Sequence, residues 1–186
     1  MNPIKNALKS LSVTTVNVIV AFIFFVITAK ISAPAFFGKI AIIQLLEVID
    51  SAFFFIIPPQ IISREIAYLY ARREIDKKIV GKFISFPFLL FPFYLILLIF
   101  PTYVKIVIPY LFLYLTTGVL NMIMTGMNMY TEYSISGIVF LVIRWGISII
   151  AVLLHDIYLF VEIWTLGAII SFSIDYFSLS RKIGII

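Results

Sequence analysis

The sequence contains no cysteine and very little charge. Without cysteine, the chain offers neither a disulfide bond nor a thiolate ligand for a metal ion. Only 12% of its 186 residues are charged, whereas 63% are hydrophobic. Water-soluble domains are about 45–50% apolar. This composition therefore excludes an ordinary soluble domain and indicates an integral membrane protein.

Residues that are typical of enzyme active sites are also scarce. The single histidine, His155, lies beside Asp156 in a predicted turn between two apolar segments. There is no D-x-D motif and no H-E-x-x-H motif of the kind that binds zinc on a helix. We therefore expect no catalytic residues, no metal site and no cofactor. An intramembrane transferase is kept as an alternative.

What the sequence has in abundance is apolar segments long enough to cross a bilayer, which takes about 20 residues in a helix. We predict an all-α integral membrane bundle that forms one lobe over residues 1–186, with six transmembrane helices. The predicted spans are residues 11–31, 38–58, 83–100, 103–124, 134–154 and 157–179. The first is too long for a signal-peptide core and is followed by no A-x-A-like cleavage site, so we expect it to be retained.

The distribution of lysine and arginine predicts the orientation. If the N-terminus is cytoplasmic, ten basic residues fall on the cytoplasmic side and three on the opposite side, a clear positive-inside bias. Six spans return the C-terminus to the cytoplasm as well. The basic stretch from Ser63 to Lys82 is then explained by topology and by contact with anionic lipid headgroups. We expect a multi-pass protein of the cell membrane and no nucleic-acid partner.

Prolines make the third and fourth predicted spans irregular. Pro87 and Pro92 lie within the third span, each without a backbone donor. We expect Pro101 to end the third span and Pro109 to bend the fourth.

Polar residues recur in several spans at steps of three or four, which places them on one helical face. In hydrocarbon such faces must turn toward other helices or toward water. The main series are Ser10, Thr14 and Asn17 in the first span, Gln44, Glu47, Asp50 and Ser51 in the second, Tyr110, Tyr114, Thr117, Asn121, Thr125, Asn128 and Glu132 along and beyond the fourth, and Glu162, Thr165 and Asp175 in the sixth.

Three charged residues lie well inside predicted spans: Glu47, Asp50 and Arg144. An isolated cation near the bilayer midplane costs at least about 2.5–3.5 kcal/mol. Either these residues form a buried structural ion pair, or they line a water-filled transport cavity. Since Arg144 is the only deeply placed cation, Glu47 or Asp50 is its natural partner.

One stretch resembles a known family. The sequence TAKISAPAFFGKIAIIQLLEVIDSAFFFIIPPQIISREIA is similar to the start of the polysaccharide (oligosaccharide) flippases of the multidrug/oligosaccharidyl-lipid/polysaccharide exporter superfamily. Ser51 stands where that family usually has glycine, and Pro58-Pro59 is unusual for it. The resemblance rests on Ala29-Lys30, the turn from Pro34 to Gly38, Asp50 in the following helix, and the exit Arg64-Glu65-Ile66-Ala67.

This resemblance implies a flippase-type transporter that moves a lipid-linked oligosaccharide or polysaccharide precursor across the membrane. Family members pair two six-helix lobes around the substrate cavity, so a second lobe is expected as a separate chain or as a second copy. Arg144 would then hold the phosphate of the lipid-linked sugar, and Glu47 or Asp50 would pair with Arg144 or couple transport to an ion. Residues of the polar faces, Asn17, Asn121 and Asn128 among them, would line the path of the sugars.

Other functions fit the same composition. Export of small drugs differs mainly in substrate, and a basic site favours an anionic lipid over a drug. A membrane assembly subunit that transports nothing is the other alternative. Activity in liposomes separates these functions, since only a transporter moves its substrate without altering it.

Overall fold

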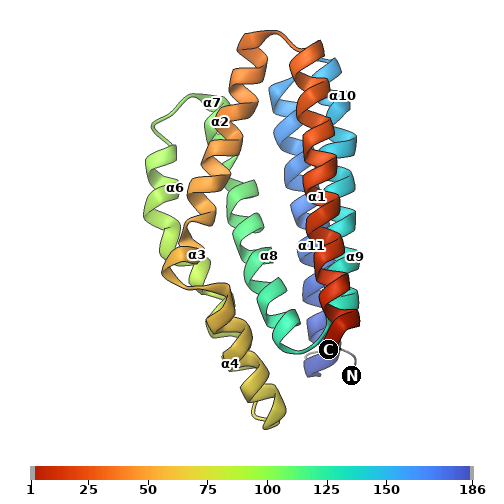
Figure 1. Cartoon of the computed structure of the whole chain (residues 1–186). Helices are drawn as coiled ribbons and strands as arrows, with labels where there is room; N and C mark the ends of the chain where they lie inside the picture. Colours follow the sequence, from red (N-terminus) through yellow and green to blue (C-terminus); the bar gives the residue numbers. More distant parts are fainter. Residues whose placement is uncertain (1–2, 185–186) are drawn as a thin grey trace.

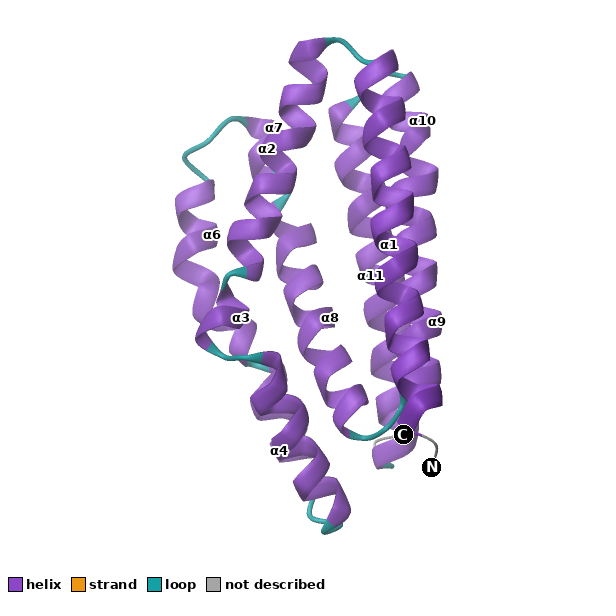
Figure 2. Cartoon of the chain, in the orientation of Figure 1, coloured by secondary structure: helices purple, strands orange, loops and turns teal. Residues whose placement is uncertain are grey.

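The structure is a computed structural model that describes the backbone of residues 3–184 and the side chains of residues 11, 13–54 and 56–184. The part of the chain that it describes is helical throughout apart from short turns, and it contains no strand (Figure 2). The helices are α1 (Pro3–Ile31), α2 (Pro34–Ser51), α3 (Phe53–Ile56), α4 (Pro59–Ala71), α5 (Lys77–Ile84), the 3₁₀ helix η1 (Phe86–Leu90), α6 (Phe91–Leu97), α7 (Thr102–Lys105), α8 (Ile108–Gly126), α9 (Tyr130–Leu141), the π-helix η2 (Val142–Ile147), α10 (Ser148–Leu153) and α11 (Ile157–Ile183).

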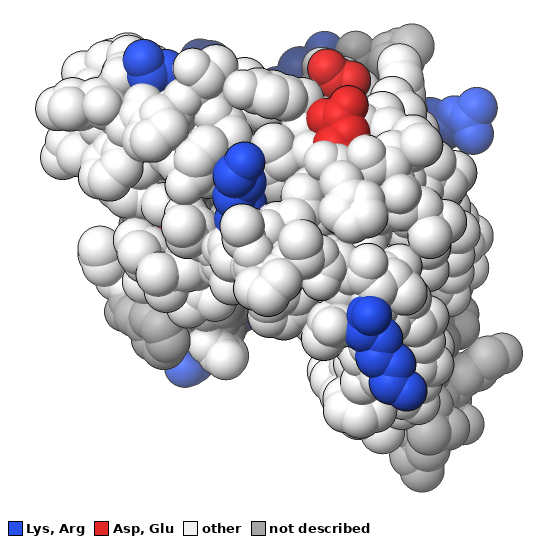
Figure 3. All heavy atoms as spheres, turned by 90° about the horizontal axis from the view of Figure 1, so that it is seen from above, with Lys and Arg blue, Asp and Glu red and all other residues white. Residues whose placement is uncertain are grey.

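The chain runs up and down along one axis. As Figure 1 shows, α1 rises, α2 descends, α6 returns upward, α8 descends, α9 and α10 rise together, and α11 descends. Both termini therefore lie at the same end of the bundle, and α4 extends beyond the bundle at that end. Seen from the opposite end, the surface is mostly uncharged, with scattered basic residues and one small acidic group (Figure 3).

Local sequence signals explain where several helices begin and end. Pro34 and Pro59 occupy the first turns of α2 and α4, where a missing backbone donor costs nothing. Asp156 caps α11 by accepting hydrogen bonds from the amides of Tyr158 and Leu159 at 2.9 and 3.1 Å. Gly184 ends the same helix in the left-handed conformation, with φ of 71°.

Large apolar side chains cover the outside of the bundle. Phe22 is 69% exposed, Ile56 74% and Ile99 84%. In water such a surface would be an aggregation hazard, whereas in lipid it faces its natural solvent. Together with the long apolar helices described next, this confirms a helical, multi-pass membrane protein.

The expected number of spans is not reached. Within the described residues, five helical segments are long and apolar enough to cross a membrane. The missing one is the predicted span 38–58. Its helix, α2, carries Lys39, Glu47 and Asp50 and stops at Ser51. The spans found are Val13–Ile31, Lys77–Leu97, Thr102–Gly126, Tyr130–Leu153 and Ile157–Ile183.

The break after the short helix α3 has a local cause. The short α3 ends at Ile56, and the Pro58-Pro59 pair then removes two successive backbone donors, so that a new helix starts at Pro59. The stretch expected as a polar connection, residues 63–82, is itself largely helical, with a turn only between Ala71 and Lys77.

The prolines act as helix starters. Pro87 and Pro92 lie in the first turns of η1 and α6, which confirms that the third span is irregular. α6 already ends at Leu97, ahead of Pro101. Pro109 lies in the first turn of α8, so it does not bend the fourth span; the break comes just before it, between α7 and α8.

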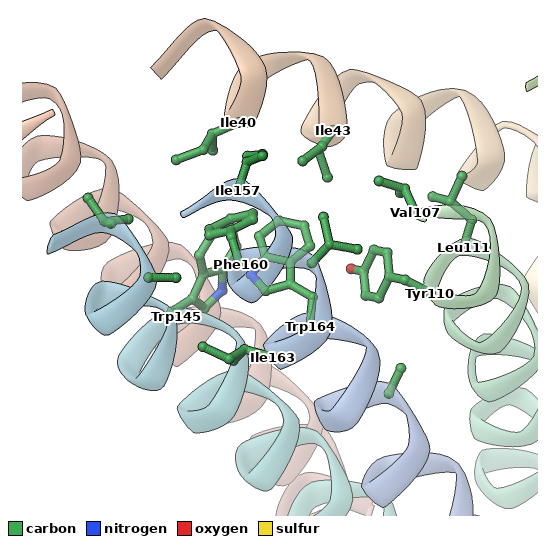
Figure 4. Close-up of a cluster of buried hydrophobic side chains, with 14 of the residues drawn as sticks. Ile40, Ile43, Val107, Tyr110, Leu111, Trp145, Ile157, Phe160, Ile163 and Trp164 are labelled. Atoms are coloured by element: carbon green, nitrogen blue, oxygen red, sulfur yellow. The ribbon is translucent and has the colours of Figure 1, made fainter. Parts of the chain in front are cut away.

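The core lies where α2, α8, η2 and α11 meet (Figure 4). The two indole rings of Trp145 and Trp164 meet edge to face, with centroids 5.4 Å apart. The labelled core residues are Ile40, Ile43, Val107, Tyr110, Leu111, Trp145, Ile157, Phe160, Ile163 and Trp164. This core surrounds the charged residues that the sequence singled out.

Candidate functional site

Arg144 lies in the π-helical turn η2, between α9 and α10. Single π-turns inside α-helices occur frequently at functional sites, because the extra residue per turn re-aims neighbouring side chains. Arg144 and Trp145 are adjacent in sequence, and both are buried, with 3% and 2% exposure. The guanidinium and the indole therefore both enter the core.

The partner of Arg144 is Glu47 of α2. The Arg144 Nη2 atom lies 2.5 Å from the Glu47 Oε2 atom, and the two side chains are 4% and 6% exposed. The Tyr110 hydroxyl donates to the same carboxylate oxygen at 2.7 Å. The Gln44 side-chain oxygen accepts a longer hydrogen bond from Arg144 at 3.4 Å. The buried cation is thus neutralised by a carboxylate that itself receives two donors, an arrangement that offsets much of the desolvation cost.

Aromatic rings enclose the guanidinium. Its central carbon lies 4.3 Å from the ring centroids of both Trp145 and Trp164. The rings of Phe140 and Tyr114 follow at 5.6 and 5.7 Å. A cation within about 6 Å of an aromatic face is attracted by the ring's quadrupole. We call these four residues the aromatic cage.

Asp50 is not the partner of Arg144. It is fully buried, and its Oδ1 atom accepts a hydrogen bond from the Tyr94 hydroxyl at 2.9 Å, which ties α2 to α6. Its other oxygen has no hydrogen-bond partner. Of the two carboxylates proposed from the sequence, Glu47 forms the ion pair and Asp50 forms a separate link.

Asn17 of α1 forms a hydrogen bond with one ring of the aromatic cage. Its side-chain oxygen accepts a hydrogen bond from Trp145 Nε1 at 3.0 Å. The residue predicted to line a sugar path thus fixes the orientation of one cage indole in this conformation.

A cavity of about 300 Å³ adjoins the cage. Two rings of the cage, Tyr114 and Phe140, are also part of the cavity wall, whereas Arg144 itself does not line the cavity. Thr117 Oγ1 and the Asn121 side-chain oxygen are buried without a hydrogen-bond partner. The lining residues, none of them charged, are Ser51, Phe54, Tyr114, Thr117, Gly118, Asn121, Gly137, Phe140, Ala168 and Ser171.

Asn128 lies elsewhere. Helix α8 ends at Gly126, and Asn128 adopts a left-handed conformation with φ of 62° in the turn that follows. It borders a different hollow of about 510 Å³ between α4 and this turn, together with Arg64. The predicted polar face of the fourth span therefore stops at Thr125, whose hydroxyl lies 3.1 Å from that of Ser63 on α4.

The aromatic cage was not predicted from the sequence. Its aromatic residues come from α8, α9, η2 and α11, and nothing in their spacing joins them. Two signals were available, since Trp145 follows Arg144 directly and Tyr114 belongs to the predicted polar face. In the described part of the chain, no group of three or more His, Cys, Asp or Glu residues is placed to hold a metal ion.

Comparison with known protein families, with curated proteins and with solved structures finds no match for this chain. The resemblance to polysaccharide flippases stays a prediction that rests on the motif around Pro34, Asp50 and Arg64.

Proposed function

We propose that the chain is one lobe of a flippase-type transporter that moves a lipid-linked oligosaccharide precursor across the cell membrane without changing its covalent structure. The observation that carries this proposal is the cavity beside the aromatic cage. It combines aromatic rings with hydrogen-bonding groups that have no partner in the protein, and it carries no charge.

The wall of the cavity suits a sugar. Tyr114 and Phe140 offer ring faces on which the apolar face of a pyranose can lie. Thr117 and Asn121 offer buried acceptors that a sugar hydroxyl would satisfy, and an unsatisfied buried polar group costs about 1–3 kcal/mol. A volume of about 300 Å³ lies at the lower end of small-molecule sites, which fits one sugar ring better than a chain.

In this conformation Arg144 is not free to hold a phosphate, the role expected for it from the sequence. Glu47 already neutralises the guanidinium, and Arg144 is not among the residues that line the cavity. A phosphate would reach Arg144 only if α2 moved away from η2 and took Glu47 with it. We therefore propose that the ion pair holds α2 against η2 in this conformation, and that a lipid phosphate replaces Glu47 when the lobe opens.

We also propose that α2 is the sixth crossing of the membrane. Its 18 residues span about 27 Å, close to the hydrocarbon thickness of about 30 Å. Its two acidic residues have partners in the bundle, since Glu47 pairs with Arg144 and Asp50 receives a hydrogen bond from Tyr94. Lys39 lies near the start of the helix, where its long side chain can reach the lipid headgroups. Both termini would then be cytoplasmic, in agreement with the distribution of basic residues.

A second lobe completes the proposed transporter. Two copies of a lobe with six spans share one orientation in the membrane, so a homodimer about an axis along the membrane normal can form the two-lobe arrangement. A separately encoded lobe would serve equally. Membrane lipids cover the remaining apolar faces.

The test is movement of an intact substrate. The protein, isolated in native-lipid particles with any lobe that accompanies it, is placed in liposomes that contain a fluorescent lipid-linked oligosaccharide. We expect the probe to become protected from an impermeant quencher, and mass spectrometry to recover it unaltered. A covalently altered probe would favour a transferase, and folded protein that moves no probe would favour an assembly subunit.

A further inference from the structure

Asp175 is a buried carboxyl that the proposed transport cavity does not use. It lies in α11 and is fully buried, and its oxygens make no hydrogen bond of ordinary length and angle; the Ser136 hydroxyl of α9 interacts with the carboxyl only more weakly. The two ion pairs among the described residues, Arg72–Glu74 and Arg144–Glu47, do not include it. Since buried carboxylates are normally paired or bound to a cation, this one requires an explanation.

Asp175 also lies far from the end of its helix. It lies eight residues before the end of α11, which corresponds to about 12 Å along the helix. Arg181 and Lys182, the basic residues in the last turn, are exposed. An ionisable residue this deep in a membrane-spanning helix is a functional candidate whose partner has to be found.

Two serine hydroxyls lie near the carboxyl. Ser136 of α9 lies beside Asp175, and its hydroxyl is 2.7 Å from the hydroxyl of Ser171. Ser171 precedes Asp175 by four residues and so lies on the same face of α11. Both serines are buried, with 0% and 2% exposure. Two helices thus bring one carboxylate and two hydroxyls together at one point.

We propose that Asp175, Ser136 and Ser171 form a binding site for a hard monovalent cation, for which Na⁺ is the probe. Carboxylate and hydroxyl oxygens are hard donors, which favour hard cations over transition metals. One carboxylate with neutral co-ligands balances a single positive charge. A divalent cation would leave a net charge of one buried among apolar helices, which is costly.

The cavity described above gives a cation a route to the proposed site. Ser171 lines the cavity, and so does Gly137, the neighbour of Ser136 in α9. The proposed site therefore lies directly behind the cavity wall, and an ion that reaches the cavity needs to pass only that wall. The site itself does not depend on the proposed transport of sugars.

The experiment measures thermal stability without any transport substrate. The full chain in native-lipid particles is melted in NaCl or choline chloride at constant ionic strength, with LiCl and KCl as further salts. We expect the melting temperature to rise with Na⁺ and to saturate. A ligand at 100 times its Kd raises it by about 5–10 °C in a protein of this size.

Variants assign the effect to the site. Asp175→Asn should lose the response to Na⁺, and Ser136→Ala should shift the half-saturating Na⁺ concentration upward about tenfold. Asp50→Asn is the matched control: Asp50 is equally buried, but Tyr94 already donates to it, so the response should persist. If Asp175→Asn does not fold, Ser136→Ala and Ser171→Ala decide the question through the same shift.

Two results would overturn the proposal. One is a melting temperature independent of Na⁺ in the unmodified chain, which would leave a proton as the occupant. The other is an Na⁺ response that persists in Asp175→Asn or is unchanged in both serine variants. A failure of sugar transport would affect neither readout.

Discussion

Replacing Arg144 with glutamine should destabilise the bundle, because it strands a buried carboxylate. In the structure, Glu47 receives two donors, Arg144 and Tyr110, and its side chain is only 6% exposed. Removing one partner of a buried ion pair typically costs about 3–5 kcal/mol, since the other charge stays buried and uncompensated. The aromatic cage also loses its cation, and each such contact contributes about 0.5–2 kcal/mol.

The assay is thermal melting in native-lipid particles, followed by intrinsic fluorescence. In a protein of 150–250 residues, 1 kcal/mol corresponds to about 2–4 °C, so the loss predicts a melting temperature lower by roughly 6–20 °C. Adding Glu47→Gln to Arg144→Gln should restore at least half of the loss, because an amide pair needs no counter-ion. Tyr110 can still donate to the new amide.

The matched control is Asp50→Asn in the Arg144→Gln background. Asp50 lies three residues from Glu47 on α2, but it is bonded to Tyr94 and not to Arg144. This second change should therefore give no rescue. Equal rescue by Asp50→Asn, or an Arg144→Gln chain that melts like the unmodified protein, would refute the assignment of the ion pair.

Two further predictions concern topology and helix packing. Single cysteines at Ala35 and Arg73 should be labelled by an impermeant reagent from opposite sides of the membrane, and labelling from one side would contradict the proposed six crossings. Gly126→Ala should cost about 1–3 kcal/mol, because the new methyl group would lie 2.6 Å from the Ser63 carbonyl oxygen of α4. Gly146→Ala, whose methyl group would meet nothing within 4 Å, should melt within a few degrees of the unmodified protein, and equal losses in both would contradict this packing.

Hydropathy predicted most of the architecture, because length and apolar composition act locally. It located α8 and α11 within a few residues of their ends. Hydropathy predicted a second span at residues 38–58, whereas α2 runs from Pro34 to Ser51. The mean hydropathy of residues 38–58 does not reveal the turn between Ser51 and Phe53. The Pro58-Pro59 pair adds a second break, since it ends α3 and starts α4.

The candidate site was only partly predictable. The sequence named both Glu47 and Asp50 as partners of Arg144, but they lie three residues apart on one helix, and spacing alone cannot separate them. Asp50 is not available to Arg144 because Tyr94, from a helix distant in the sequence, donates a hydrogen bond to it. Asn128 lies off the predicted helical face, because a period of three to four residues continues in the sequence after the helix itself has ended at Gly126.

The central claim, that the uncharged cavity carries the sugar during transport, is tested most directly by changing its wall in the liposome assay. Asn121→Leu and Thr117→Val remove the two buried acceptors that have no partner in the protein. A hydrogen bond of about 1.4 kcal/mol to the moving sugar corresponds to a tenfold change in rate.

Thr165→Val is the control, since the Thr165 hydroxyl donates only to the Val161 carbonyl oxygen of its own helix at 2.8 Å. We predict that the initial rate of oligosaccharide movement falls about tenfold in each cavity variant, with the protein folded, and stays unchanged in Thr165→Val. Equal rates in all three variants and in the unmodified protein would contradict the claim.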